Sequence, residues 1–266
     1  MPIGDSYHLV ARNKINKFLL KRLGMFDLHT HIRVGALIKF FEDCIRSRRY
    51  SEMKVLELGC GTGINAFELA KVSKKCHTKL KYTGVDINRE GIKKANQVLR
   101  CHKLTAKITF FNEDARVFLK NHEDLTINCI LLMDIIEHIE DVRDALDLAD
   151  RHLQKGGIYI VSTPTPLYPK VFGRKFHEKI GHVVDGYSLE ALDRLFVKHL
   201  NCRRLMYKYN TGLLCSIGCW LYHLFDFDNK YFNILKSLIL YPFKFLDFYN
   251  SPQISCTLFA VYKKER

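Results

Sequence analysis

Residues 55–63 read V-L-E-L-G-C-G-T-G, a short apolar run that leads into three glycines spaced two apart. Glycine tolerates positive φ angles and lets a ligand approach the backbone closely. A helical pattern follows the third glycine, and the free N–H groups at a helix N-terminus suit a negatively charged or carbonyl-rich ligand. The stretch therefore predicts a strand, a ligand-binding turn and a helix in direct succession.

Dinucleotide-binding enzymes carry a similar turn with the pattern G-x-G-x-x-G. Two residues argue against a dinucleotide site in this chain. Ile64 stands where that pattern has glycine or alanine, and Glu57 places a carboxylate at the end of the strand. A carboxylate repels a pyrophosphate but attracts a ligand that carries ammonium and sulfonium charges. The turn therefore favours a cationic ligand.

Short apolar runs alternate with helical patterns around this turn. The strand-like runs are 54–58, 80–86, 107–111, 127–133 and 157–162. Such alternation implies right-handed crossovers and a parallel sheet covered by helices on both faces. A helical pattern at 189–199 and two further strand-like runs, 202–209 and 254–262, follow. The expected fold class is α/β, a doubly wound Rossmann-like sheet of seven strands, mostly parallel with an antiparallel last strand.

Acidic side chains stand at the ends of the next three predicted strands. Asp86 ends the second strand, Asp114 follows the third and Asp134 follows the fourth. In an open parallel sheet, ligands bind across the carboxyl ends of the strands. We therefore expect these carboxylates to line one crevice with Glu57. Asp86 is placed to accept hydrogen bonds from both hydroxyls of a ribose.

These residues resemble the class I S-adenosylmethionine-dependent methyltransferases. The motifs that carry the resemblance are E-L-G-C-G-T-G, G-V-D, E-D-A, M-D-I-I-E-H-I and L-Q-K-G-G, which begin at Glu57, Gly84, Glu113, Met133 and Leu153. The resemblance covers about residues 50–163 closely and extends loosely to the last strand. The subgroup is similar to the small-molecule methyltransferases of ubiquinone and menaquinone biosynthesis. One departure is Lys155, where the family usually has proline.

The resemblance implies S-adenosylmethionine as the cofactor and assigns its binding residues. Those expected at the methionine end are Glu57, Gly59, Gly61, Gly63, Met133 and Asp134. Those expected around the adenosine are Asp86, Ile87, Asp114 and Ala115. Arg33 is either a partner of the methionine carboxylate or a solvated helix charge. No metal site is expected, because no cysteine–histidine group shows ligand spacing.

Methyl transfer from a sulfonium is an in-line displacement, so catalysis depends largely on the alignment of acceptor, methyl group and sulfur. An acceptor hydroxyl or amine also needs a base near neutrality, for which histidine is suited. The candidate catalytic residues are His182 and His138. Each has a structural alternative: His182 orders the loop 162–187, and His138 fixes the turn after the fourth strand.

Three regions are expected along the chain. Residues 1–50 form basic N-terminal helices, and residues 51–210 with 253–266 form the S-adenosylmethionine-binding domain. Residues 211–252 form a helical insertion that holds 11 aromatic residues. Its first helix is expected to present Leu213, Ile217, Trp220, Leu221 and Leu224 on one face. This insertion packs on the sheet edge, forms a dimer interface, or lies on the inner face of a membrane as a peripheral contact.

Net charge and cysteine usage indicate the kind of partner and the cellular compartment to expect. Lysine and arginine exceed aspartate and glutamate by 14, and residues 1–50 and 170–208 carry most of that excess. Such an excess favours nucleic acid, anionic lipid or acidic metabolites as partners. The nine cysteines include no C-x-x-C pair, and the first 20 residues lack a secretory pattern. These features indicate a reducing cytoplasm, and no stretch is long and apolar enough to span a membrane.

The expected function is transfer of a methyl group to oxygen, nitrogen or carbon of a small apolar or lipid-linked acceptor. One alternative is an RNA methyltransferase, which the positive charge permits. Against it, the fourth strand is followed neither by an N/D-P-P-Y motif nor by a Pro-Cys nucleophile, so nucleic acid is not the expected partner. A second alternative is a non-catalytic scaffold, which the intact glycines and acids disfavour.

Overall fold

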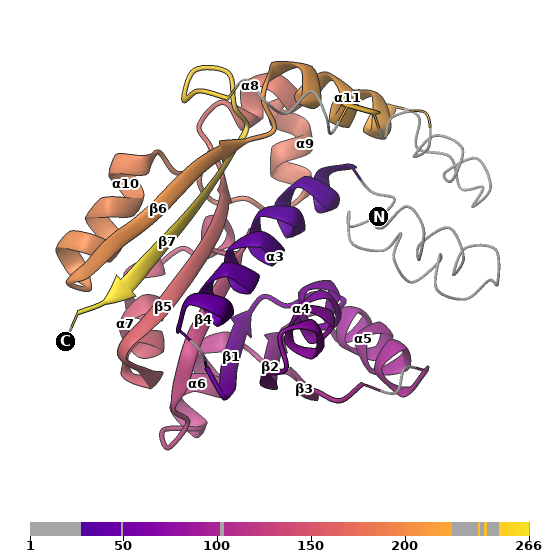
Figure 1. Ribbon diagram of the computed structural model, residues 1–266. Coiled ribbons are helices and arrows are strands. Elements are labelled where there is room, and N and C mark those ends of the chain that lie inside the picture. Colours follow the sequence, from indigo (N-terminus) through magenta and orange to yellow (C-terminus); the bar gives the residue numbers. More distant parts are fainter. Residues whose placement is uncertain are drawn as a thin grey trace.

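The computed structural model describes residues 28–48, 50–101, 104–224, 239, 242–243 and 250–265. Its strands are β1 (Glu52–Leu58), β2 (Lys79–Asp86), β3 (Lys107–Asn112), β4 (Ile127–Met133), β5 (Leu153–Pro164), β6 (Cys202–Asn210) and β7 (Thr257–Lys264). They form one sheet in the order β3-β2-β1-β4-β5-β7-β6 (Figure 1). β7 runs antiparallel to both of its neighbours, whereas the pairs among β1 to β5 are parallel. The predicted fold class is confirmed.

Helices cover both faces of this sheet (Figure 1). They are α3 (Leu28–Arg48), α4 (Ile64–Lys75), α5 (Arg89–Cys101), α6 (Ala115–Asn121), α7 (Val142–His152), α8 (Tyr168–Phe172), α9 (Arg174–Lys179), α10 (Leu189–Asp193) and α11 (Leu213–Leu224). A 3-10 turn (Ile136–His138) follows β4, and a π-helical turn (Arg194–His199) continues α10. None of these helices is long and apolar enough to span a lipid bilayer.

The core consists of two apolar layers, one on each face of the sheet. Along β1, Met53 and Val55 pack in the layer that includes α3, α4 and α5, while Leu56 and Leu58 pack in the layer with α6 and α7. Successive side chains of a strand point to opposite faces, so a strand buried on both sides reads as a continuous apolar run. By the same alternation Glu57 lies on the α3 and α4 side.

The order of the strands in the sheet determines where the site lies. β1 lies between β2 and β4, so successive strands are added first on one side of β1 and then on the other. At such a switch point the loops that follow the two central strands diverge and leave a crevice at the carboxyl edge of the sheet. The glycine turn after β1 and the 3-10 turn after β4 therefore border the same crevice.

The starts of two strands differ from the prediction by three residues or more. β5 begins at Leu153, so the L-Q-K-G-G stretch belongs to the strand rather than to a turn before it. The pairing of β4 with β5 shifts register between Ile127 and Cys129, and Gly156 has a φ of 75°. A bulge of this kind lets a strand continue through a glycine pair that a sequence pattern reads as a turn. β7 starts at Thr257, three residues later than expected.

α11 has both exposed apolar and buried polar side chains. Ile217, expected on the apolar face of the helix, is 44% exposed, and Leu214 is 46% exposed. Among the side chains of this helix that the structure describes, Cys215 and Ser216 are buried. Ser216 Oγ donates to the Thr211 carbonyl at 2.9 Å, which satisfies its hydroxyl in the interior. Most of the rest of the insertion, and the helical pattern expected before residue 28, lie outside the described residues.

Candidate functional site

The three glycines after β1 all adopt left-handed backbone conformations, with φ of 75° at Gly59, 52° at Gly61 and 76° at Gly63. A Cβ atom on Gly59 would lie 2.6 Å from Ile135, and one on Gly63 would lie 2.6 Å from Phe110. No atom lies within 4 Å of the corresponding position at Gly61. Gly59 and Gly63 therefore allow close packing, whereas Gly61 faces open space that a ligand can enter.

Glu57 is a buried carboxylate at the base of this turn, with 1% of its surface exposed. Its Oε1 accepts a hydrogen bond from Asn65 Nδ2 at 2.5 Å, and its Oε2 has no partner among the residues described. Burial raises the pKa of Glu57 to about 8, against the opposing effects of the Asn65 hydrogen bond and the Arg33 charge. A buried acceptor without a donor is costly, so Oε2 is suited to a ligand that donates hydrogen bonds.

Asp86 and Ile87 follow β2 at the edge of the glycine turn. The carboxylate of Asp86 accepts from Gly61 N at 2.6 Å and from Asn88 N at 2.7 Å. Two carboxylate oxygens offer about four acceptor sites, which leaves capacity for the hydroxyls of a ribose. Ile87 is 76% exposed, as a side chain that packs against a bound base would be in the free protein.

Asp114 and Ala115 lie after β3, at the start of α6. Asp114 Oδ1 accepts from Arg116 N at 2.8 Å and from Val117 N at 3.3 Å, so this carboxylate caps the helix. Ala115 is its first residue and packs against the apolar layer that holds Phe118. The structure thus shows a helix cap at the position where the resemblance implies an adenine contact.

Asp134 joins three elements after β4. It has a positive φ of 53°, its Oδ1 accepts from Ser162 Oγ at 2.8 Å, and its Oδ2 pairs with Arg33 Nη1 of α3. Met133, the last residue of β4, is buried. The side chain of Arg33 is only 18% exposed, so Arg33 is not a solvated helix charge. The structure places it instead within reach of the crevice.

The two candidate catalytic histidines lie next to each other. The His138 ring meets the His182 ring edge to face at 4.7 Å between centroids, and His138 Nδ1 lies 2.9 Å from the Gly181 carbonyl. His182 also contacts the buried His177, at 4.5 Å. Burial and the two neighbouring imidazoles lower the pKa of His182 to about 4, which keeps its ring neutral at pH 7. The structure therefore brings together two residues that are distant in sequence.

Glu137 completes this group; the sequence places it after the fourth strand, at the mouth of the crevice, as a structural rather than a catalytic residue. It is fully buried, its Oε2 accepts from Thr163 Oγ1 at 3.2 Å, and burial raises its pKa well above the usual range. Glu137, His138 and His182 each offer one ligand atom, and these three atoms lie within 4.8 Å of one another. A carboxylate with two imidazoles could hold a divalent transition metal. The sequence indicated each of these residues but not their meeting, because only the fold brings His182 beside Glu137 and His138.

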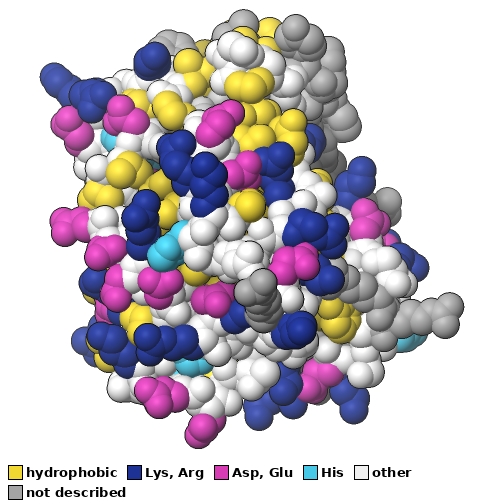
Figure 2. Space-filling model, turned by 90° about the vertical axis from the view of Figure 1, so that its left-hand side faces the viewer, with side chains coloured by type: hydrophobic (Ala, Val, Ile, Leu, Met, Phe, Trp, Pro, Cys, Tyr) yellow, Lys and Arg dark blue, Asp and Glu magenta, His cyan; other side chains and the backbone are white. Residues whose placement is uncertain are grey.

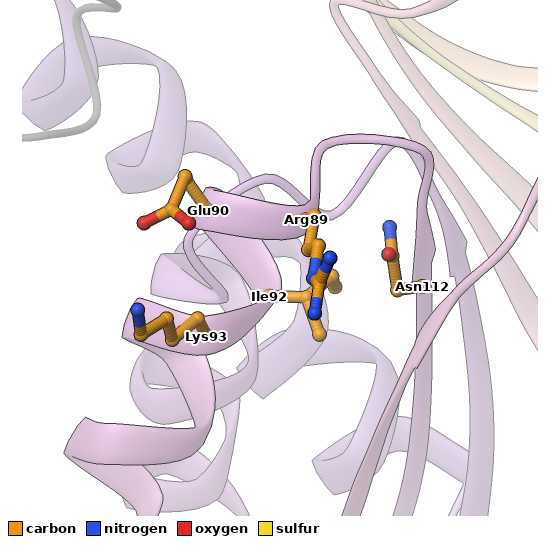
Figure 3. Close-up of a pocket in the computed structure, with 5 residues that line it drawn as sticks. All are labelled: Arg89, Glu90, Ile92, Lys93 and Asn112. Atoms are coloured by element: carbon orange, nitrogen blue, oxygen red, sulfur yellow. The ribbon is translucent and has the colours of Figure 1, made fainter.

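A hollow of about 410 Å³ lies beside the adenosine end of the expected site, between α5 and β3 (Figure 3). Its lining residues are Arg89, Glu90, Ile92, Lys93 and Asn112. Asn112 Nδ2 donates to the carbonyls of Asp86 and Ile87, which fixes the turn after β2. Asn112 could not be identified from the sequence, since an exposed asparagine at a strand end is common.

Negative charge gathers at this edge of a strongly basic protein. The carboxylates of Asp86 and Asp134 both act on Glu57, and Asp134 acts on Glu137 as well. Arg33 is the cation that opposes them in both cases. Like charges held together in a low-dielectric site favour a positively charged ligand.

Comparisons with known proteins identify the same fold and family. A family model described as a methyltransferase domain matches residues 50–208. Ubiquinone biosynthesis O-methyltransferase of Rickettsia typhi is 25% identical over 140 residues, which are 53% of this chain and 52% of that protein. The match thus spans about half the length of this curated relative.

Two solved structures share the fold at low identity. The plantazolicin methyltransferase BamL, solved with a triazolic desmethylPZN analogue and SAH, has a TM-score of 0.58 and 12% identity, with 99% of this chain and 96% of that chain covered. A SAM-dependent methyltransferase from Archaeoglobus fulgidus has a TM-score of 0.51 and 17% identity, with 95% and 100% covered. Such low identity is evidence for the fold alone.

Proposed function

The chain belongs to the methyltransferase domain family, as the class I motifs implied, and we propose that it transfers a methyl group from S-adenosylmethionine to a small apolar or lipid-linked acceptor. The observation that carries this proposal is the open glycine turn at Gly61, enclosed by the carboxylates of Glu57, Asp86 and Asp134. When bound, S-adenosylmethionine supplies an electrophilic methyl group on a sulfonium sulfur. Its two positive charges match the negative charge of the crevice.

The residues present fit such a donor. The unpartnered Oε2 of Glu57 can accept from an ammonium group, and the remaining acceptor capacity of Asp86 suits a ribose diol. Ile87 is exposed where it would cover a base. Arg33 lies at the crevice and can reach a methionine carboxylate by exchanging its partner Asp134. These residues would fix the donor while the acceptor approaches in line.

The acceptor side is proposed to lie under the loop between α9 and α10. Val183 N donates to the Glu137 carbonyl at 2.9 Å, which holds this loop against the 3-10 turn. The His182 ring is neutral at pH 7 and can take a proton from an acceptor hydroxyl or amine as the bond to carbon forms, as a weaker base than a free imidazole. His138 is proposed to orient His182 through their edge-to-face contact. A carbon acceptor would use the same enclosure for alignment alone.

Label transfer from radioactive S-adenosylmethionine into the lipid, RNA and aqueous fractions of a cell extract tests this proposal. We expect label in the lipid fraction for the unaltered protein. Asp86→Ala should weaken donor affinity at least tenfold by calorimetry, because hydrogen bonds to a charged group are lost. His182→Gln should keep donor affinity and lower the transfer rate about 100-fold.

Matched controls and opposing outcomes sharpen this test. His199→Gln, a surface histidine paired with Asp147, should change neither donor affinity nor transfer rate. Label confined to RNA would establish the alternative acceptor class. Absence of donor binding by the unaltered protein would overturn the proposed function, and full activity of His182→Gln would remove that residue from the mechanism.

A further inference from the structure

Asn65 is a buried polar residue that is not among the expected cofactor-binding residues. It is the second residue of α4, directly behind the glycine turn, and 4% of its surface is exposed. Its Nδ2 donates to Glu57 Oε1 at 2.5 Å, so the two side chains form one hydrogen-bonded pair. An amide buried in the first turn of a helix needs a reason, because asparagine is a poor helix former and its burial is costly.

With Glu57 ionised, as a cationic ligand would make it, this pair presents two acceptors and no donor. Glu57 Oε2 and Asn65 Oδ1 are both inaccessible to solvent, and neither has a hydrogen-bond partner among the residues described. Native interiors satisfy nearly all such atoms, and exceptions point to a role beyond folding. A group that satisfies both must donate at least two hydrogen bonds. An ammonium group offers three donors and no acceptor.

The charges around the pair favour the same ligand. Arg33, Asp86 and Asp134 are the charged groups that act on Glu57, and two of these three are negative. Arg33 is already paired with Asp134 and does not satisfy the two orphan oxygens. A neutral amide beside Glu57 adds an acceptor without a further like charge, which a second carboxylate would bring.

We propose that Asn65 is a donor-binding residue that, together with Glu57, receives the ammonium group of the methionine moiety through Asn65 Oδ1 and Glu57 Oε2. This inference rests on the proposed function, since it needs S-adenosylmethionine as the ligand. It makes Asn65 a contact to the amino-acid end of the donor only. Adenosine binding, at Asp86 and Ile87, should not depend on it.

Calorimetry with two related ligands distinguishes binding of the amino-acid end of the donor from binding of its adenosine. S-adenosylhomocysteine carries the amino-acid group, whereas 5′-methylthioadenosine has the same adenosine and a thioether but lacks that group. For Asn65→Ala we expect S-adenosylhomocysteine to bind about 10- to 100-fold more weakly, the range of one hydrogen bond to a charged group. The affinity for 5′-methylthioadenosine should stay within about twofold. Asn65→Ser, whose hydroxyl is too short to reach the same position, should show the same selective loss.

Ser73→Ala is the matched control, because Ser73 is a buried polar residue of α4 whose hydroxyl bonds to the Thr78 carbonyl away from the site. It should leave both affinities unchanged, and thermal melts should show that all variants fold. Equal losses for the two ligands would assign Asn65 to the shape of the glycine turn and overturn the proposal. Unchanged affinity for S-adenosylhomocysteine would also overturn it. Failure of the unaltered protein to bind either ligand would instead overturn the proposed function.

Discussion

Glu57 shows how one buried side chain links stability to ligand binding. Among the residues described, none donates a hydrogen bond to its Oε2. Desolvation therefore favours the protonated, neutral form of this carboxyl group in the free protein. A cationic ligand reverses this balance, because it stabilises the carboxylate directly. The same residue therefore lowers the stability of the free protein near neutral pH and raises its affinity for the donor.

Glu57→Gln should remove a pH-dependent loss of stability. The folded-state pKa of about 8 exceeds the usual 4.5, so the stabilising contribution of the protonated form is complete below pH 4.5 and is lost as pH rises towards 8. We expect the free energy of unfolding of the variant to gain on that of the unaltered protein steadily from pH 5 to 8, measured by urea denaturation without donor.

Glu42→Gln serves as the control for this pH series. Hydrogen bonds from Lys75 and Arg46 lower the pKa of Glu42, so it is ionised throughout the range. Its replacement should shift stability by a constant amount between pH 5 and 8. A constant difference for Glu57→Gln as well would contradict the raised pKa.

At the scale of elements, the glycine turn contains two kinds of glycine that the sequence does not distinguish. Gly61→Ala should cost about 1–2 kcal/mol of stability, the cost of a left-handed conformation for a residue with a Cβ. Gly63→Ala should cost about 2–5 kcal/mol, because the new methyl group also meets Phe110. Urea denaturation measures both values.

Donor affinity should show the opposite order for this pair. The methyl group of Gly61→Ala enters the open space that we assign to the ligand, so S-adenosylhomocysteine should bind more weakly to it than to folded Gly63→Ala. Equal stabilities would show that Phe110 moves aside at no cost. A normal affinity of Gly61→Ala would place the ligand elsewhere.

The sequence predicted the elements that carry the site, because each motif ends a strand and the sheet aligns those ends. Glu57 and Asp86 could be placed in one crevice because the carboxyl ends of parallel strands meet at one edge of the sheet. Contacts between distant segments could not be foreseen. The Arg33–Asp134 pair depends on how α3 crosses the sheet, and the His138–His182 contact depends on the path of an irregular loop. Asn65 gave no signal, because only its burial and its bond to Glu57 distinguish it from any helix residue.

α11 illustrates a different limit. Periodicity predicted the helix and an apolar face but left open what covers that face. Leu214 and Ile217 are exposed, whereas Ser216 is buried, with its hydroxyl 2.9 Å from the Thr211 carbonyl oxygen and 3.2 Å from the Cys256 sulfur. Hydrophobicity alone ranks these residues in the reverse order, because it does not include the hydrogen-bond partners that the tertiary structure supplies to a buried hydroxyl.

At the scale of the whole molecule, apolar and basic groups meet at one end. Cys215 of α11 packs with Ile32 of α3 and Phe172 of α8, so these helices are neighbours. Figure 2 shows hydrophobic side chains gathered at the upper end of one face, the end where α8 and α11 lie in Figure 1. The exposed basic residues of α8 and α9 are Lys170, Arg174, Lys175 and Lys179. Exposed apolar groups beside lysine and arginine are typical of a surface that binds anionic lipid headgroups.

Replacement of both Leu214 and Ile217 by serine should therefore lower co-sedimentation with anionic phosphatidylserine vesicles severalfold, because each buried apolar side chain and each nearby basic residue contributes about 1 kcal/mol or more. Val197→Ser removes a comparably exposed apolar residue from the π-helical turn after α10 and should leave pelleting unchanged. Equal pelleting of all three proteins would exclude this face as a lipid contact. A change from dimer to monomer in the double variant, seen by analytical ultracentrifugation, would assign the face to contacts between copies of the chain.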